Sequence, residues 1–477
     1  MLSFIRESGR PKSMENLWIL AVLLFHFGLG LAASHSTVNY LPGFRGPLPF
    51  ELQTGYVGVD KSEDVQLFYY FIKSEGNPKE DPLLLWLTGG PGCSGLSCLL
   101  FEIGPVAVEV VEYNGSLPTL TLNTHSWTQV ASIIFIDMPV GTGFSYARTQ
   151  LASHSSDLMQ VRQAIEFLRK WLRDHPEFIS NPIYISGDSY SGKTIPAITQ
   201  QISEENEKGM EPLVNLKGYI IGNGVTDSSF DSNSKIPYAH GMSLISEELY
   251  ESLKRSCGEE YVDIDPSNTE CLKHMQEFNE DLSGIFPNHI LEPICAFASP
   301  KPFELFEKTR SRSFGDNSKD ILQIDPFPTI GCRSYGYLLS YIWVNDKSVR
   351  EALHIREGTV KHWLRCNYGI SYTNDMPSSI KYHLYLSKKG YRSLIYSGDH
   401  DMIVPFLGTQ GWIRSLNYSI VNDWRPWLVE GQIAGYTRTY SNRMTFATVK
   451  NGGHTAPEYK PAECIAMLKR WISEKPL

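Results

Sequence analysis

Short apolar stretches without alternation are the feature of the sequence that most restricts its fold. Leu83–Leu87 (LLLWL) and Ser132–Ile136 (SIIFI) are apolar at nearly every position, and residues 182–186 (PIYIS) and 216–221 (LKGYII) follow the same pattern. Strands of this kind are buried on both faces, as in the parallel sheets of α/β proteins. Apolar residues recur with helical spacing over residues 158–172. This alternation predicts an α/β fold with a mostly parallel central sheet and helices on both faces.

The second half of the chain predicts one domain interrupted by an insertion. Residues 227–328 are more polar, and residues 299–328 are the part that most resembles a long loop. Strand signals return at residues 393–396 and at Met444–Val449, and a helix follows over Pro461–Ile472. We therefore expect a single domain over residues 34–477 with a helical cap at about 227–328.

The N-terminus has the composition of a secretory signal. Basic residues precede an apolar run over residues 17–33, which ends in small residues, so residues 1–33 are expected to be a signal peptide. A membrane anchor is the alternative, but the run contains His26 and is shorter than the roughly 20 apolar residues of a typical span. We expect entry into the secretory pathway, a vacuolar or extracellular location and no stable membrane insertion.

Charge and cysteine usage restrict the partners. The net charge of −9 provides no general basic surface for nucleic acid. In an oxidising compartment an even number of cysteines without C-x-x-C spacing favours disulfides over a metal site. Asn114 and Asn417 begin N-glycosylation motifs in polar stretches. The eight cysteines are Cys93, Cys98, Cys257, Cys271, Cys295, Cys332, Cys366 and Cys464.

The octapeptide at residues 187–194 (GDSYSGKT) is consistent with two incompatible chemistries. It satisfies the phosphate-loop pattern G-x-x-x-x-G-K-[ST] after a strand and before a helix, and Asp137 could serve as a magnesium-binding acid. It also fits a nucleophile elbow, the sharp strand-to-helix turn that would present Ser189. The elbow pattern G-x-S-x-G is not met strictly, because Ser191 occupies its last position and a glycine follows.

Three observations favour the elbow. The strand that ends in Asp137 precedes the octapeptide, whereas the acid of a nucleotide site usually follows it. A secretory protein with disulfides is an unusual ATPase. An elbow also requires an acid and then a histidine downstream. Asp399 and Asp401 follow the strand at 393–396, and His454 follows Met444–Val449, so both requirements can be met.

Acyl transfer also needs two backbone N–H groups directed at the developing oxyanion. One comes from the residue after the nucleophile, here Tyr190, and the other from an earlier loop. The glycine-rich segment at residues 88–92 (TGGPG) follows a predicted strand, and we assign Gly90 as the second donor.

Six segments, distributed over most of the chain, resemble the signature blocks of serine carboxypeptidases. The resemblance implies an α/β-hydrolase fold, a triad of Ser189, Asp401 and His454, and an oxyanion hole formed by Gly90 and Tyr190. No metal or cofactor is implied. The segments are WLTGGPGCSG (86–95), DMPVGTGFSY (137–146), ISGDSYSG (185–192), IIGNGVTD (220–227), YSGDHDMIVP (396–405) and NGGHTAPEYKP (451–461).

Two departures from the peptidase pattern concern the substrate. Peptidases of the family typically have asparagine and glutamate where this chain has Thr88 and Asp188, and that pair binds the terminal carboxylate of the peptide. Thr88, Gly89 and Asp188 are thus the expected substrate-binding residues. The chain is most similar here, and at residues 298–306 and 350–363, to plant serine carboxypeptidase-like acyltransferases. These enzymes move an acyl group from a 1-O-glucose ester to an alcohol, so we expect a small-molecule acyl donor and an alcohol acceptor.

Two other functions are compatible with the same sequence blocks. A serine carboxypeptidase acting at acidic pH is the main alternative, and a non-catalytic protein is disfavoured because all three triad positions are filled. The resemblance also implies the disulfides Cys93–Cys332 and Cys257–Cys271. It leaves Cys295 either free or paired with Cys98, Cys366 or Cys464. Some relatives are cleaved in the loop that corresponds to residues 299–328.

Overall fold

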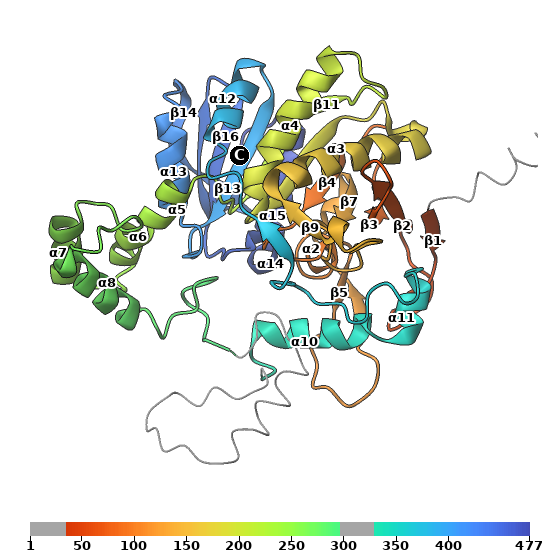
Figure 1. Cartoon of the computed structure of the whole chain (residues 1–477), viewed down its shortest axis with the longest axis horizontal. Coiled ribbons are helices and arrows are strands. Elements are labelled where there is room, and N and C mark those ends of the chain that lie inside the picture. The colour runs from red at the N-terminus through yellow and green to blue at the C-terminus, as the bar shows by residue number, and fades with distance from the viewer. Residues whose placement is uncertain (1–34, 296–328) are drawn as a thin grey trace, which may run out of the picture.

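A single large sheet organises the molecule (Figure 1). The structure, a computed structural model, describes residues 35–295 and 329–477. The expected signal peptide (1–33), the segment at 298–306 and the loop at 299–328 lie outside the described residues. In spatial order the strands are β1 (His35–Val38), β2 (Leu52–Val59), β3 (Val65–Ile72), β7 (Ser132–Ile136), β4 (Leu83–Leu87), β10 (Ile183–Asp188), β11 (Leu216–Gly222), β13 (Arg392–Gly398), β16 (Met444–Val449), β15 (Gln432–Tyr440) and β14 (Ile420–Val429), and β8 (Tyr146–Ala147) pairs with β3.

The centre of the sheet is parallel and its two edges are antiparallel. Strands β7, β4, β10, β11, β13 and β16 pair in parallel, and β1–β3 and β14–β15 are added antiparallel at the two edges. All four mostly apolar stretches lie in this parallel centre, as predicted. The carboxyl ends of parallel strands meet at one edge, which is where α/β proteins bind ligands.

Alternate residues of the central strands enter two separate cores. Leu84 and Trp86 of β4 belong to one hydrophobic cluster, and Leu83, Leu85 and Leu87 belong to the other. The first cluster includes α2 (Gly95–Phe101), α10 (Arg333–Val344), α11 (Lys347–Ala352), α14 (Ala456–Tyr459) and α15 (Pro461–Ile472). The second includes α3 (Asp157–Asp174), α4 (Ser191–Glu207), α12 (Ile380–Lys388) and α13 (Phe406–Ser415). The predicted fold class, helices on both faces of a mostly parallel sheet, is confirmed.

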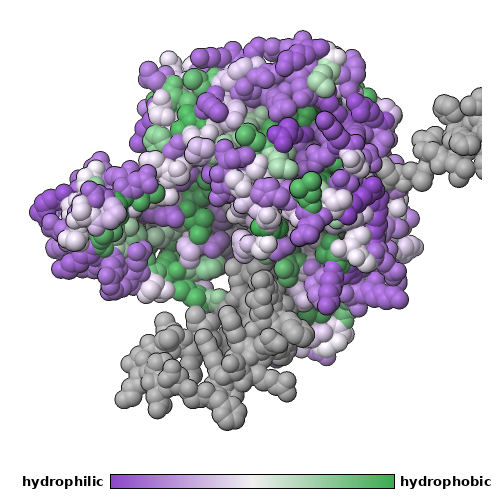
Figure 2. Space-filling view, in the orientation of Figure 1, coloured by the Kyte–Doolittle hydropathy of each residue, from purple (hydrophilic) through white to green (hydrophobic). Residues whose placement is uncertain are grey.

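Within the expected cap, the described residues 227–295 include four helices that form a lobe at one side of the sheet (Figure 1). They are α5 (Ser228–Asn233), α6 (Lys235–Gly241), α7 (Glu247–Cys257) and α8 (Thr269–Asp281). The lobe has its own apolar cluster, in which Tyr238, Leu253 and Phe278 are buried together with Met402 from the body of the protein. Figure 2 shows a mostly hydrophilic surface on the lobe and hydrophobic residues in the hollow between the lobe and the body.

Short elements complete the described chain. Strand β9 (His154–Ser156) pairs in parallel with β12 (Ser371–Thr373), and β5 (Val106–Val108) pairs antiparallel with β6 (Leu120–Leu122). Three 3₁₀ turns cover Trp127–Gln129, Leu151–Ser153 and Pro176–Phe178. Within the described ranges, no helix is both long enough and apolar enough to cross a membrane.

The disulfides correct one expectation from the resemblance. Cys257 pairs with Cys271 as expected, but Cys93 pairs with Cys366, so the expected Cys93–Cys332 bridge is wrong. Cys93 and Cys366 form an isolated antiparallel bridge between two loops, in which Ser94 N donates to Arg365 O (2.8 Å). Cys332 lies just before α10 and pairs with Cys295, so Cys295 is not free and its partner is none of Cys98, Cys366 and Cys464. Cys98 and Cys464 are buried thiols.

Candidate active site

Ser189 lies on a sharp turn between β10 and α4. Its backbone is left-handed (φ +55°), a conformation that costs a non-glycine residue about 1–3 kcal/mol and recurs at functional sites. The turn is held on both sides, because Ser189 N donates to Gly222 O (2.9 Å) and Ser189 O accepts from Gly192 N (3.0 Å) and Val225 N (2.9 Å). The strain is therefore supported by the surrounding chain.

Small residues around the turn are required by close backbone packing. A Cβ on Gly187 would lie 2.0 Å from Leu87 O, so no side chain fits there. Ser191 fits because its hydroxyl donates to Asp188 O (2.6 Å). The departure from the strict elbow pattern is thus accommodated by a hydrogen bond.

The two residues that suggested a phosphate loop have other contacts. Lys193 is buried, and its Nζ lies 5.2 Å from the ring centroid of Tyr190. Asp137 is fully buried and accepts hydrogen bonds from Ser94 Oγ (2.5 Å), Gly95 N (2.9 Å) and Phe144 N (2.9 Å). Its oxygens hold the loop before α2 and the loop after β7 together, which is a structural role. The octapeptide therefore has the geometry of an elbow.

Three side chains from three loops converge at the carboxyl edge of the sheet. Ser189 Oγ lies 2.7 Å from His454 Nε2, and His454 Nδ1 lies 2.9 Å from Asp401 Oδ2. The loops follow β10, β13 and β16, so the parallel sheet itself places the three residues together. In this arrangement the imidazole can take the serine proton while the carboxylate orients it.

Of the two candidate acids, only Asp401 contacts His454. Asp401 is fully buried; its Oδ1 accepts from Ile403 N (2.7 Å), and its Oδ2 accepts from Asn223 Nδ2 (2.9 Å) as well as from the imidazole. Asp399 accepts instead from His400 Nδ1 (2.6 Å) and from a backbone N–H after β16. Sequence reasoning missed Asn223, although its position directly after β11 places it at the same sheet edge.

The surroundings favour a charged imidazole during the reaction. Burial alone would lower the pKa of His454, but the charge and hydrogen bond of Asp401 raise that pKa above its ordinary value, and Asp188 adds to the effect. A raised pKa stabilises the imidazolium that forms when the serine proton is taken. His454 must be neutral to accept the serine proton, so enzymatic activity should fall as the pH drops through the pKa of His454.

The glycine loop lies against the serine. A Cβ on Gly89 would be 2.4 Å from Ser189 Cβ and 2.8 Å from Tyr190 N, so only glycine allows this approach. Gly90 follows with φ +114°, which also favours glycine. The loop that carries Gly90 is thus adjacent to the proposed nucleophile and to the N–H of Tyr190. The assignment of these two N–H groups as oxyanion donors stays a prediction.

A pocket of about 890 Å³, part of it open to solvent, lies beside Ser189 and His454. Sequence reasoning identified the loops that carry the triad and missed the walls contributed by α10, by the loop around Arg365 and by the segment after α8. Those walls depend on tertiary packing of distant segments. The lining residues are Thr88, Gly89, Gly90, Cys93, Glu102, Asp188, Ser189, Phe286, Asn288, Tyr337, Arg365, Cys366, Tyr368, Ile403, His454, Thr455 and Tyr459.

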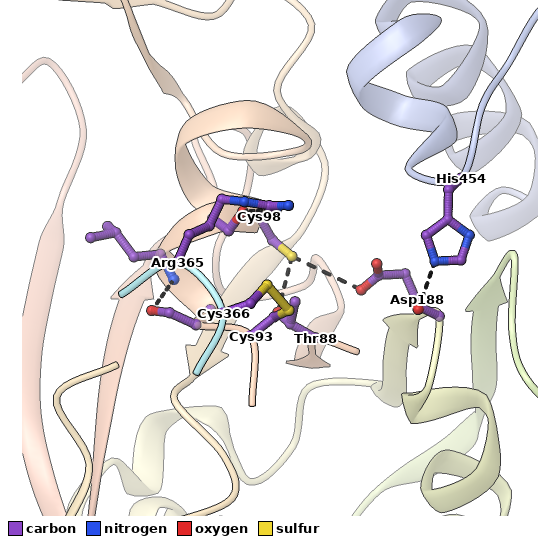
Figure 3. The surroundings of a disulfide bond; sticks show 12 residues. Thr88, Cys93, Cys98, Asp188, Arg365, Cys366 and His454 are labelled. Carbon is purple, nitrogen blue, oxygen red and sulfur yellow. Dashed lines mark hydrogen bonds between the residues drawn. A yellow bond between two sulfur atoms is a disulfide. The ribbon is translucent and has the colours of Figure 1, made fainter. Parts of the chain in front are cut away.

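The floor of the pocket is a buried polar cluster (Figure 3). Cys98 Sγ lies 3.0 Å from Thr88 Oγ1, 3.3 Å from Glu102 Oε1 and 4.0 Å from Asp188 Oδ1. Burial raises the pKa of Asp188 to about 7, and burial together with neighbouring acids raises the pKa of Glu102 and of the Cys98 thiol well above their ordinary values. Among the described residues, Glu102 Oε2 has no hydrogen-bond partner. The floor thus consists of groups that favour their neutral forms.

The same three groups, Cys98, Glu102 and Asp188, have one potential ligand atom each within 4.8 Å of one another. A metal ion would require them to lose protons, which the raised pKa values oppose. Arg365 also lies against this cluster, with its guanidinium 4.0 Å from the ring centroid of Tyr337 and bonded to Ser97 Oγ (3.1 Å). We assign no metal to the cluster.

The two glycosylation motifs are accessible. Asn114 and Asn417 are both exposed, and the Asn114 carboxamide oxygen accepts from Ser116 Oγ (2.5 Å) within its own motif. Their positions are compatible with the predicted glycans.

Comparisons with known proteins agree with the geometry. The family model for serine carboxypeptidases (Peptidase_S10) matches residues 42–474. Serine carboxypeptidase-like 17 of Arabidopsis thaliana is 53% identical over 460 residues, which cover 96% of this chain and 98% of that protein. Serine carboxypeptidase-like 1 of the same plant is 55% identical over 468 residues, covering 97% and 98%.

Among solved structures, the chain is similar in fold to Kex1(delta)p, a prohormone-processing carboxypeptidase of Saccharomyces cerevisiae. The TM-score is 0.69 at 23% identity, with 92% of this chain and 95% of the yeast chain covered. At this identity the likeness concerns the fold.

Proposed function

The chain belongs to the serine carboxypeptidase family, and from this premise we propose that it is an acyltransferase that moves an acyl group from a 1-O-glucose ester to an alcohol through an acyl-enzyme. Ser189 is the nucleophile, His454 the general base and acid, and Asp401 the residue that orients the imidazole. The backbone N–H groups of Gly90 and Tyr190 are the oxyanion donors. The proposed location is the vacuole or the extracellular space, which suits the three disulfides.

The reaction has two half-reactions. His454 takes the proton of Ser189 as Oγ attacks the ester carbonyl; the bond to the glucose oxygen then breaks, and the imidazolium protonates that oxygen. In the second half, an alcohol loses its proton to His454 and attacks the acyl-enzyme, which regenerates the serine. Peptide hydrolysis would use the same atoms with an amine as leaving group and water as acceptor.

The observation that carries the proposal is the chemistry of the pocket floor. Family peptidases are expected to bind a terminal carboxylate with an asparagine and a glutamate, and Thr88 and Asp188 stand in those positions. The Thr88 hydroxyl already lies 3.0 Å from the Cys98 sulfur, and a threonine provides one donor where an amide provides two. Asp188 is also one methylene shorter. A peptide carboxylate would therefore leave polar groups unpaired, which is costly in a buried site.

Neutral acids on the floor suit an uncharged sugar. Because burial raises the pKa of Asp188 to about 7, and that of Glu102 well above its usual value, both groups hold a proton at mildly acidic pH. A protonated carboxyl group can both donate and accept, as sugar hydroxyls do. The lobe formed by α5–α8, within the proposed cap, would then shape access for the acceptor.

One experiment separates transferase from peptidase. Purified protein is incubated with a 1-O-acyl glucose plus an alcohol, and separately with a blocked dipeptide. We expect ester transfer that exceeds ester hydrolysis, and little release of the terminal amino acid. Ser189→Ala should lower turnover by about 10⁶-fold if the triad acts as a unit. Efficient dipeptide cleavage without ester transfer would overturn the proposal.

A second variant tests the pocket floor itself. Thr88→Asn combined with Asp188→Glu introduces the peptidase pair, so dipeptide cleavage should rise relative to the wild type. Thr88→Ser is the matched control, because it keeps a single hydroxyl. No gain in dipeptide cleavage by the double variant would show that the floor does not set the substrate.

Carboxypeptidase activity is the second candidate function, and the fold shared with the yeast carboxypeptidase favours it. It predicts efficient release of C-terminal amino acids at acidic pH, where the proposed transferase predicts little. A non-catalytic role would instead predict that a fluorophosphonate fails to label Ser189.

A further inference from the structure

The side chain of the proposed oxyanion residue Tyr190 is anchored by residues outside the triad. Its hydroxyl donates to Asp157 Oδ1 (2.8 Å) and also lies 2.8 Å from a second acceptor, Asn374 Oδ1. Asp157 is fully buried. Its Oδ1 also accepts from the Tyr372 hydroxyl (2.7 Å), and its Oδ2 accepts from Met376 N (2.9 Å). One buried carboxylate thus connects the elbow to residues 372–376.

We propose that Asp157 is a positioning residue for the oxyanion hole: through the Tyr190 side chain it holds the backbone N–H of Tyr190 beside Ser189. This inference rests on the proposed acyl transfer at Ser189, whether the acyl group passes to an alcohol or to water. Asp157 touches neither substrate nor reacting atoms, so its effect is indirect.

The local backbone explains why Tyr190 needs an anchor. Tyr190 follows the strained Ser189 and is the N-cap residue directly before α4, where backbone N–H groups lack helical partners. Its side chain makes no capping bond to α4 in the described structure. The side chain is fixed by the contacts of its hydroxyl with Asp157 and Asn374 and by Lys193 Nζ, 5.2 Å from the ring centroid. A displacement of about 1 Å in a catalytic group can cost about 100-fold in rate.

Asp157 is itself held rigidly. It is the first residue of α3, where a helix N-terminus stabilises negative charge, and Ser156 caps the helix by accepting from Met159 N (3.2 Å). Strand β9, which ends at Ser156, pairs in register with β12, so that Tyr372 lies opposite Ser155. Gln160 Nε2 donates to the Tyr372 hydroxyl (3.0 Å). The carboxylate therefore sits at a fixed junction of three chain segments.

Burial and the charge of Asp157 raise the pKa of Tyr190 above its ordinary value, so the hydroxyl remains a donor over the working pH range. The ring of Tyr190 also packs edge-on against the ring of Tyr372, with centroids 6.1 Å apart. Both tyrosines thus share one acceptor and one aromatic contact.

The test compares three variants on an activated ester that acylates Ser189. Asp157→Asn and Tyr190→Phe should each lower kcat by about 10- to 100-fold, a part of the 10²–10³-fold value of one oxyanion donor, with KM changed less than threefold. Tyr372→Phe is the matched control: it removes one hydroxyl bond to Asp157 but leaves the bond to Tyr190, so kcat should fall less than fivefold. If Asp157→Asn does not fold, Tyr190→Phe is compared with Asn374→Ala, which removes the other acceptor of the Tyr190 hydroxyl and should lower kcat less than fivefold.

A boronic acid inhibitor provides a readout that a merely structural role would not move. Its tetrahedral adduct with Ser189 places an oxygen in the oxyanion hole. In Tyr190→Phe, the affinity for the boronic acid should therefore fall in step with kcat, whereas the affinity for the unreactive product acid should stay the same. Unchanged kcat and unchanged boronate affinity in Tyr190→Phe would overturn the inference. Failure of the wild type to react with a fluorophosphonate would instead overturn the proposed function.

Discussion

Replacing Asp401 with asparagine tests the hydrogen-bond pattern of the site most stringently. All the groups that contact this carboxylate are donors: His454 Nδ1, Asn223 Nδ2, Ile403 N and Val404 N. An asparagine has one accepting oxygen, and the two backbone N–H groups retain it. Its amide nitrogen then faces His454, where the wild type has an acceptor.

The consequence is the wrong tautomer of the imidazole. A donor opposite Nδ1 makes that nitrogen the acceptor, so the proton moves to Nε2, 2.7 Å from Ser189 Oγ. The base can then no longer accept the serine proton. We expect kcat to fall by about 10⁴-fold, the loss seen when a triad carboxylate becomes an amide, which corresponds to about 5.4 kcal/mol of barrier. KM should change little, because Asp401 does not line the pocket.

The assay is the pH dependence of kcat and kcat/KM on an activated ester. Asp401 raises the pKa of His454, so the acidic limb of the wild-type profile should move to lower pH in Asp401→Asn. Asp399→Asn is the matched control, since Asp399 contacts His400 and not His454; its loss should stay below tenfold. Activity of Asp401→Asn within tenfold of wild type, or an equal loss in Asp399→Asn, would refute the assignment of the acid.

Three further predictions test the loop, the floor and the crosslinks. Gly89→Ala should lower kcat by about 10²-fold, because the added Cβ would lie 2.6 Å from the serine Oγ; wild-type kcat would contradict the packing. Burial raises the pKa of Asp188 to about 7 in the folded protein, so the folded state loses stability as the pH rises from about 4 to about 7. Asp188→Asn removes this penalty and should therefore raise Tm more at pH 7.5 than at pH 5. Each kcal/mol recovered is worth about 2 °C or less in a chain of this size, and equal Tm changes at both pH values would refute the linkage. Non-reducing peptide mapping should join Cys93 to Cys366, and a Cys93–Cys332 peptide would contradict the structure.

The centre of the fold could be predicted because its signal is local. An apolar run such as Leu83–Leu87 is sufficient to place a strand in the middle of a parallel sheet, and residues directly after such strands meet at one edge. That rule alone brings Ser189, Asp401 and His454 into one neighbourhood. The strand pattern alone does not choose between Asp399 and Asp401, which lie two residues apart after the same strand; the resemblance selects Asp401, and the contact with His454 supports it.

The edges and the crosslinks depend on tertiary contacts that the sequence does not reveal. Strand β14 carries Asn422, Asp423 and Pro426, a composition that argues against a strand except at a sheet edge, which is where it lies. The Cys93–Cys366 pair depends on how two distant loops pair with each other. The anchoring of Tyr190 by Asp157 likewise joins segments with no sequence pattern in common.

The most direct test of the proposed chemistry is to observe the covalent intermediate. Wild-type protein is mixed with a 1-O-acyl glucose, quenched in acid within seconds and digested for mass spectrometry. The account predicts the mass of the acyl group on the peptide that contains Ser189, faster loss of that mass when an alcohol is present than in water alone, and no adduct in Ser189→Ala. An adduct on another residue, or an adduct that an alcohol does not discharge, would contradict it.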